Sequence, residues 1–233
     1  MGKLNKTALN DQHVQLGAHM IEFEGWEMPL HYQSGIVQEH LITRKAAGLF
    51  DISHMGRFIV RGEDAVAFLQ HVLTNNAAAL EEEEGHYTMI SNENGGVIDD
   101  AYLYRFVADE FILVVNAANR EKDFAHLDKI RPSFGQVELI DRTAEISMLS
   151  LQGPTAKDIM LDLISGGRLP EPLRNCLSTA QINGSQVLIS RTGYTGEPIC
   201  FELFIARPDV AGIWQALLAK GAQPIGLGAR DTL

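Results

Sequence analysis

A group of turn-forming residues near the middle of the chain constrains the fold most strongly. Residues 92–96 (Asn-Glu-Asn-Gly-Gly) separate two runs rich in apolar and aromatic residues, 87–91 and 97–106. Asparagine and glycine tolerate the positive φ that a tight connection between strands requires, so the pattern predicts a β-hairpin. A third apolar run, residues 111–115, extends the hairpin into a small sheet. Hairpin-linked strands mixed with helices indicate the α+β class.

Apolar residues recur at helical spacing on both sides of this block. Ile36, Val37 and Leu41 share one face of residues 36–47, which predicts a helix that packs on that face, with Ser34 as its N-cap. Further helices are predicted at residues 63–73, 119–130, 153–164 and 209–220, and further strands at 58–60, 146–151, 187–190 and 201–205. We therefore expect a compact middle block, a sheet with helices on one face, between two mixed regions.

Composition and charge exclude several classes of function. The 233 residues include 19 Lys and Arg against 30 Asp and Glu, a net charge of -11, and such a surface repels the phosphates of nucleic acids. No apolar stretch approaches the roughly 20 residues that a membrane span needs. Two cysteines without CxxC spacing, and an N-terminal segment without the apolar core of a secretory signal, predict a cytoplasmic protein.

Two adjacent acids, Asp99 and Asp100, follow the predicted turn. Neighbours on a strand point to opposite faces, so both carboxylates cannot face one pocket unless the strand is bulged. This spacing argues against a glycosidase, which needs two acids flanking one bond. We expect one acid to face inward and the other to face solvent or cap the turn. From the residues alone, two turn acids without a further role remain an alternative.

Two glycine-containing segments near the end of the chain also carry polar residues. In residues 191–197 (RTGYTGE), Glu197 could accept N–H groups from a flat ligand, and an ordinary β-turn with an exposed Glu is the alternative. In residues 226–231 (GLGARD), Arg230 could bind a ligand carboxylate, and a surface ion pair is the alternative. The eight histidines show no metal-binding spacing, and neither a phosphate loop nor a GxSxG motif occurs, so no metal is expected.

Six motifs in a fixed order point to a known family. In chain order they are residues 23–30 (FEGWEMPL), 48–55 (GLFDISHM), 95–100 (GGVIDD), 149–154 (LSLQGP), 191–197 (RTGYTGE) and 226–233 (GLGARDTL). Together they closely resemble the aminomethyltransferase family of the glycine cleavage system, the T-proteins. The resemblance covers nearly the whole chain.

The resemblance implies a particular domain organisation. A discontinuous first folate-binding domain, residues 1–53 and 143–233, would hold an inserted ferredoxin-like domain, residues 54–142, around a folate cleft. The family has a C-terminal β-barrel-like domain after the position of Leu233, so we expect that domain to be absent from this chain.

The resemblance also implies a reaction and a partner. The methylene of the aminomethyl group carried by lipoylated H-protein would pass to tetrahydrofolate, releasing ammonia and giving 5,10-methylenetetrahydrofolate. The partners would be H-protein and the small-molecule folate, with no nucleic acid and no membrane. An acidic carrier would need a local basic patch, and Arg44, Lys45 and Arg120 are candidates. The alternatives are a folate-dependent demethylase or a non-catalytic folate-binding protein of the same superfamily. The Asp-Asp pair that follows Gly-Gly in residues 95–100 favours the T-protein.

Six residues of this chain match the family's site. They are Met55, Tyr87, Asp100, Asn116, Glu197 and Arg230, with Asp100 as the catalytic residue. A carboxylate in the place of Asp100 can orient folate nitrogens, stabilise positive charge on the transferred carbon and help to move a proton. Glu197 would hydrogen-bond the pterin ring, and Met55 would line the same channel.

Overall fold

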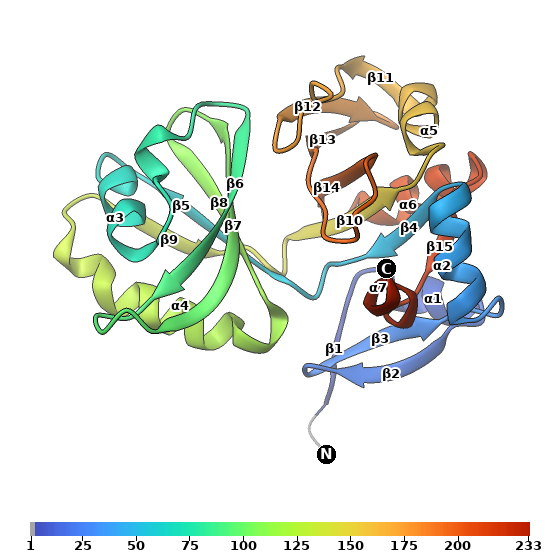
Figure 1. Ribbon diagram of the computed structural model, residues 1–233, viewed down its shortest axis with the longest axis horizontal. Coiled ribbons are helices and arrows are strands. Elements are labelled where there is room, and N and C mark those ends of the chain that lie inside the picture. Colours follow the sequence, from blue (N-terminus) through green and yellow to red (C-terminus); the bar gives the residue numbers. More distant parts are fainter. Residues whose placement is uncertain (1–2) are drawn as a thin grey trace. The chain divides into compact units, whose positions relative to one another are not determined.

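The chain forms two compact units in a computed structural model that describes residues 3–233 (Figure 1). Unit 1 comprises residues 3–54, 145–174 and 178–233, and unit 2 comprises residues 55–144 and 175–177. Both units combine antiparallel strands with helices, so the predicted α+β class with an inserted second part is confirmed. The chain changes unit one residue after the first predicted boundary and two after the second. The addition of residues 175–177 to unit 2 was not predicted. The folate-binding and ferredoxin-like assignments stay predictions.

Unit 2 is built on a five-stranded sheet of order β6-β7-β8-β5-β9. The strands are β5 (Gly56–Arg61), β6 (Glu84–Ser91), β7 (Val97–Val107), β8 (Glu110–Val115) and β9 (Glu138–Asp141). All neighbours are antiparallel, and β6 and β7 form the predicted hairpin. Its turn is held by Asn92, whose Oδ1 accepts the backbone N–H groups of Asn94 and Gly96, both at 2.9 Å.

Helices cover one face of this sheet. They are α3 (Ala65–Val72) and α4 (Arg120–Ile130), with the short 3-10 turns η1 (Ala77–Ala79), η2 (Ala117–Asn119) and η3 (Arg131–Ser133). The core between helices and sheet contains Phe58 from β5, Phe68 from α3, Leu103 from β7 and Leu127 from α4, all fully buried. Alternate residues of the strands supply this core, as a sheet packed on one face requires.

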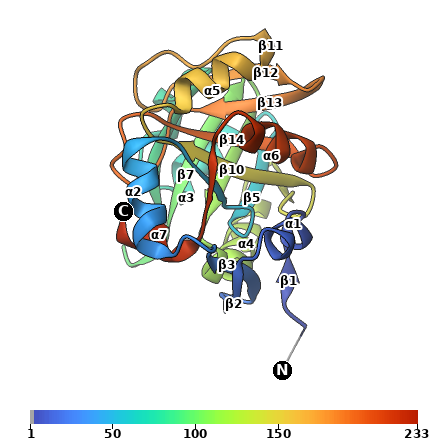
Figure 2. The same ribbon diagram turned by 90° about the vertical axis from the view of Figure 1, so that its right-hand side faces the viewer.

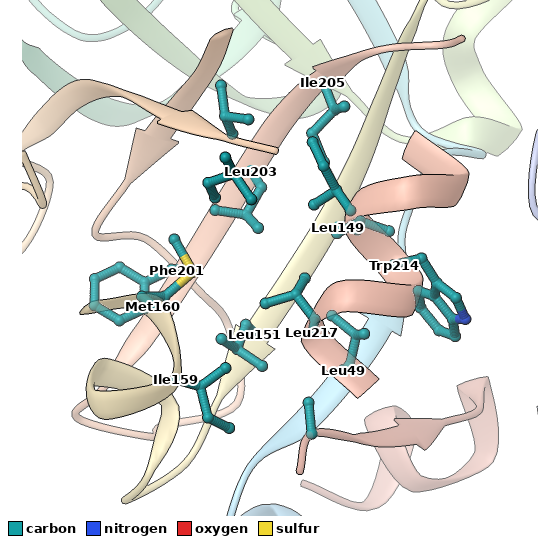
Figure 3. Close-up of a cluster of buried hydrophobic side chains, with 14 of the residues drawn as sticks. Leu49, Leu149, Leu151, Ile159, Met160, Phe201, Leu203, Ile205, Trp214 and Leu217 are labelled. Carbon is teal, nitrogen blue, oxygen red and sulfur yellow. The ribbon is translucent and has the colours of Figure 1, made fainter. Parts of the chain in front are cut away.

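Unit 1 is built on a seven-stranded sheet of order β11-β12-β13-β14-β10-β4-β15. The strands are β4 (Gly48–Asp51), β10 (Ile146–Gln152), β11 (Ile164–Gly167), β12 (Leu177–Ile182), β13 (Ser185–Ser190), β14 (Cys200–Ala206) and β15 (Gln223–Ile225). Helices α5 (Ala156–Leu163) and α6 (Val210–Ala219) lie on the same face of this sheet (Figure 2). Between them, Leu149 and Leu151 of β10 and Leu203 of β14 pack against Met160 of α5 and Trp214 of α6 (Figure 3).

A second, three-stranded sheet of unit 1 was not predicted. It has the order β1-β3-β2 and consists of β1 (Asn5–Lys6), β2 (His19–Phe23) and β3 (Trp26–His31). The remaining helices of this unit are α1 (Asn10–Gln15), α2 (Ile36–Lys45) and α7 (Leu227–Thr232). Among the described residues, no helix is long and apolar enough to cross a membrane.

The prediction for helix α2 was wrong in two respects. Its N-cap is Gly35, and the Ser34 hydroxyl instead donates to Glu39. The expected packing face is turned outward, since Val37 is 69% and Leu41 37% exposed. The buried face carries Glu39, which is fully buried and accepts the backbone N–H groups of Tyr32 at 2.6 Å and Gly226 at 2.8 Å. A carboxylate that satisfies two buried backbone donors stabilises this contact in a way that apolar periodicity cannot reveal.

Candidate functional site

The acid pair of unit 2 lies where β7 follows an irregularity in the sheet. Ile90 pairs with Asp99 but Ser91 pairs with Val97, so Ile98 is an extra residue in β7. The extra residue precedes both acids, and Asp99 and Asp100 pair in register with Ile90 and Met89, so the bulge does not bring the two side chains to one face of the sheet. Asp99 is buried, as predicted for one of the two acids, and Asp100 is half-buried.

Asn116 connects the two acids. Its side-chain Nδ2 donates to Oδ1 of Asp99 at 3.0 Å and to Oδ1 of Asp100 at 2.7 Å. Its backbone N–H and the Nδ2 of Asn119 also donate to Asp99, at 3.1 and 2.7 Å. Three N–H groups therefore hold Asp99 as an acceptor, whereas Asp100 keeps lone pairs that this network does not use.

The register of the sheet brings further predicted residues to the same end. Ala101 of β7 and Gly56 of β5 both pair with Val115 of β8, so Asp100, Asn116 and Met55 occupy adjacent positions at one end of three neighbouring strands. Tyr87 of β6 is 45% exposed and lies close to Asp100. Partial burial, and then the interaction with Asp100, raise the pKa of Tyr87. Four predicted site residues are thus gathered within unit 2.

A third acid, which the sequence analysis did not single out, lies beside this network. Asp123 of α4 is fully buried, and neither of its carboxyl oxygens has a hydrogen-bond donor within residues 3–233. Burial, followed by the interaction with Asp99, raises the pKa of Asp123 to about 8. At neutral pH its carboxyl group is therefore a neutral acid.

The segment 191–199 of unit 1 forms one wall of a pocket of about 520 Å³. Arg174, Arg191, Tyr194, Glu197 and Cys200 are among the residues that line it. Burial, and then the charge of Glu202, raises the pKa of the Cys200 thiol to about 12, so this group is neutral.

Hydrogen bonds to buried side chains of the sheet hold segment 191–199 in place. The Thr192 hydroxyl donates to buried Glu202, and the Thr195 hydroxyl donates to Gln152. The Gln152 amide in turn donates to Ser150 at 3.0 Å. Buried side chains of β10 and β14 therefore fix the path of the pocket wall.

Glu197 is not the exposed turn residue of the alternative interpretation, because its side chain is only 7% exposed. Its Oε1 accepts a hydrogen bond from Nη1 of Arg44 at 2.6 Å, and Nη2 of Arg44 donates to the Leu233 carbonyl at 2.6 Å. Arg230, on α7, does not line the pocket, and within residues 3–233 its guanidinium makes no ion pair. Sequence reasoning missed the pair of Arg44 and Glu197 because 153 residues separate the partners.

The expected basic patch is not supported by these pairings. Arg44 is neutralised by Glu197, and Arg120 forms an ion pair with Asp141 at 3.1 Å. Lys45 is exposed at the last turn of α2. Of the three candidates, Lys45 alone therefore lacks an ion pair within the described part of the chain.

Comparison with known proteins relates this arrangement to one family. The model of the GCVT N-terminal domain matches residues 9–233. A curated protein named aminomethyltransferase from Thermus thermophilus is 46% identical over 99% of this chain, and another from Chlorobaculum parvum is 44% identical over the same share. The chain spans 65% and 64% of the lengths of these two relatives.

Solved structures agree with the sequence relatives. Glycine cleavage system aminomethyltransferase T from Bartonella henselae superposes with a TM-score of 0.84 at 35% identity, covering 99% of this chain and 62% of that one. Heterotetrameric sarcosine oxidase from Corynebacterium sp. U-96 matches with a TM-score of 0.62 at 17% identity, which shows a shared fold only. The resemblance inferred from the six motifs is confirmed, and the chain belongs to the GCVT N-terminal domain family.

Proposed function

We propose that this protein is a tetrahydrofolate-dependent aminomethyltransferase of the glycine cleavage system. It would move the methylene of the aminomethyl group from lipoylated H-protein to tetrahydrofolate, with release of ammonia. The observation that carries this proposal is the network of unit 2, in which Asn116 holds Asp100 beside Tyr87. The names of the relatives in Thermus thermophilus and Bartonella henselae support it.

Asp100 is the proposed catalytic residue because it is an oriented carboxylate with unused lone pairs. The Asn116 amide holds its Oδ1 at 2.7 Å from within unit 2, and Tyr87 lies close by. In that position it can hold an N–H group of the folate. It can also stabilise the positive charge that develops on the transferred carbon as ammonia leaves, and it can pass a proton.

Glu197 is the proposed partner of the pterin ring because its second oxygen is available. Oε1 is held by Arg44, whereas Oε2 accepts no hydrogen bond within residues 3–233. A carboxylate oxygen accepts N–H groups, which are the donors on the edge of a pterin. The half-exposed ring of Tyr194 and the flat wall of the loop suit a planar ligand in the same pocket.

Calorimetric titration of the chain with 5-formyltetrahydrofolate tests the binding site. We expect saturable one-to-one binding, and Glu197→Gln should weaken it by about tenfold or more, since a hydrogen bond to a charged group is lost. Glu171→Gln is the matched control, because Glu171 lies next to Pro172 of the pocket but is 70% exposed. No binding to the wild-type chain, or equal losses in both variants, would count against the folate site.

A transfer assay with aminomethylated H-protein tests the role of Asp100. Asp100→Asn should lower turnover by roughly 100-fold with little change in folate affinity, the pattern of a group that acts in the transition state. Glu93→Gln in the exposed turn of the hairpin serves as the control and should retain full turnover. Near-normal transfer by Asp100→Asn, with folate still bound, would show that the catalytic assignment is wrong.

A further inference from the structure

The carboxyl group of Asp123 is buried without a conventional hydrogen-bond donor. Its residue is 0% exposed, and no N–H or O–H group among residues 3–233 donates to either oxygen. Asn119, four residues before Asp123 and at the start of the same helix, donates to Oδ1 of Asp99 at 2.7 Å, so the Asp99 carboxylate lies beside this face of α4, and its interaction with Asp123 raises the pKa of Asp123. Two adjacent carboxyl groups can form a hydrogen bond only when a proton lies between them, and holding one proton removes the repulsion of two buried anions.

The surroundings of the two groups determine which of them carries the proton. Asp99 already accepts three N–H groups from Asn116 and Asn119, so both of its oxygens serve as acceptors. Asp123 has no such donors, so the proton resides on Asp123 and is donated to Asp99. This assignment agrees with the direction in which burial and the neighbouring charge of Asp99 shift the pKa of Asp123.

Other charged groups near the pair act in both directions. Asp100 on β7 also raises the pKa of Asp123, while Lys122 on α4 lowers it. The Lys122 ammonium group is held by the Ile98 carbonyl at 2.9 Å. Tyr87 on β6 lies near Asp100, and partial burial and then the charges of Asp100 and Asp99 raise its pKa. Burial and Asp99 raise the pKa of Asp123 by more than Lys122 lowers it, so Asp123 keeps its proton near neutral pH.

The pair connects to the proposed catalytic residue through a single side chain. The Asn116 amide has two hydrogens, and Nδ2 donates to both Asp99 and Asp100. Its orientation therefore depends on Asp99 remaining in place as an acceptor. If Asp123 loses its proton, two buried carboxylates repel each other and the acceptor of Asn116 is displaced.

We propose that Asp123 is a positioning residue, which donates its proton to Asp99 and thereby fixes Asn116 and the orientation of Asp100. The functional meaning of this network rests on the proposed aminomethyl transfer, whereas its existence is a property of unit 2 alone. Asp123 itself would touch neither folate nor the transferred carbon.

A pH titration by NMR of the folate-free chain tests the network. The side-chain amide signals of Asn116, assigned by their loss in Asn116→Ala, should shift between pH 6 and 9 with a midpoint near the pKa of about 8. Asp123→Asn keeps a neutral donor of the same shape, so the shift should vanish while the fold is retained. Asp128→Asn is the matched control on the same helix and should leave the shift unchanged, because Asp128 is 48% exposed and pairs with Arg131.

Two results would overturn the proposal. One is the absence of any transition of Asn116 in the wild-type chain, and the other is its persistence in Asp123→Asn. Asp99→Asn provides a second test if Asp123→Asn fails to fold. Loss of the neighbouring anion should lower the midpoint of the Asp123 carboxyl by about one pH unit or more, and an unchanged midpoint would refute the shared proton.

Activity separates positioning from simple packing. At pH 7, Asp123→Asn should transfer within about threefold of wild type, whereas Asp123→Ala should lose about tenfold or more in turnover with little change in folate affinity. Wild-type turnover should fall as the pH rises through about 8, and Asp123→Asn should lack this fall. A wild-type protein without transfer would contradict the proposed function, while the folate-free titration would still decide the role of Asp123.

Discussion

Replacement of Asp51 by asparagine should destabilise unit 1 in a pH-dependent way. Asp51 ends β4, and its side chain is fully buried. Oδ2 lies 3.0 Å from Nε2 of His13, and Oδ1 accepts the backbone N–H of Ser53 at 2.9 Å. Burial alone would raise the pKa of Asp51, but the hydrogen bond and electrostatic interaction with His13, with further hydrogen bonds from Ser53 and Thr7, lower it to about 2.

The structure gives the size of the effect. A carboxylate can only accept, so Nε2 of His13 carries a hydrogen that it donates to Oδ2 of Asp51, while Nδ1 lies 2.9 Å from the Tyr32 hydroxyl. In Asp51→Asn, an amide group replaces Oδ2 and faces this N–H, so one donor meets another. Loss of a buried hydrogen bond to a charged group should lower the free energy of unfolding by about 2–3 kcal/mol.

The pH dependence follows from the lowered pKa. The carboxyl group has a pKa of 3.8 when unperturbed and about 2 in the folded chain, so its stabilisation is complete above the higher value and is lost as the pH falls through the lower one. Of about 2 kcal/mol supplied by this shift, about 1 kcal/mol should be gone at pH 3. The difference between wild type and Asp51→Asn should therefore shrink from pH 6 to pH 3.

Urea unfolding followed by tryptophan fluorescence measures this difference. The two tryptophans, Trp26 and Trp214, both belong to unit 1, so the signal reports the unit that contains Asp51. Asp11→Asn, an exposed position on α1, is the control and should change stability by less than about 0.5 kcal/mol. A loss below about 0.5 kcal/mol for Asp51→Asn at pH 6, or a difference that does not shrink towards pH 3, would refute the reasoning.

Two glycines of unit 1 should respond to alanine in opposite ways. Gly153 has φ +121° and a Cβ there would collide with the carbonyl oxygen of Ala46, so Gly153→Ala should lose about 2 kcal/mol or more of unfolding free energy. Gly212 lies within α6 with open space around it, so Gly212→Ala should gain about 0.5–1 kcal/mol of unfolding free energy. Shifts of the urea midpoint in the same direction for both variants would contradict this pair of predictions. Cys200 should not react with a thiol reagent at pH 8 in the native chain, since its thiolate fraction is roughly one in 10⁴. Denatured protein should show two reactive thiols and native protein at most one, Cys176.

The elements predicted correctly are those that local chemistry determines. The hairpin of β6 and β7 follows from its Asn and Gly residues, and α6 follows from an apolar stripe that the structure buries. The three-stranded sheet near the N-terminus escaped prediction because β1 and β2 expose much of their surface and lack strong alternation. The orientation of α2 escaped because Glu39 is satisfied by the backbone of distant residues.

The candidate site likewise contains residues that a local pattern predicts and contacts that only the structure reveals. Asp99 and Asp100 stand out because a turn motif precedes them, and strand geometry predicts that one faces inward. Their connection through Asn116 depends on the register of β7 and β8, which no local pattern reveals. Asp123 looks like any acid on the charged face of a helix, and only the three-dimensional structure places it against Asp99.

The pairing of β4 with β10 also has a consequence for how the chain reaches its native state. Ser53 and Met148 are hydrogen-bonded although 95 residues separate them, and nearly all of unit 2 lies in between. Closing so long a flexible loop costs about 4 kcal/mol of chain entropy or more. Folding of unit 2 by itself brings the two ends of the inserted segment together, since the Arg142 N–H donates to the Arg57 carbonyl at 2.9 Å. Once unit 2 is folded, only a few flexible residues remain to be closed. Unit 2 should therefore fold first during synthesis, and the speed with which unit 1 completes its sheet should depend on the stability of unit 2.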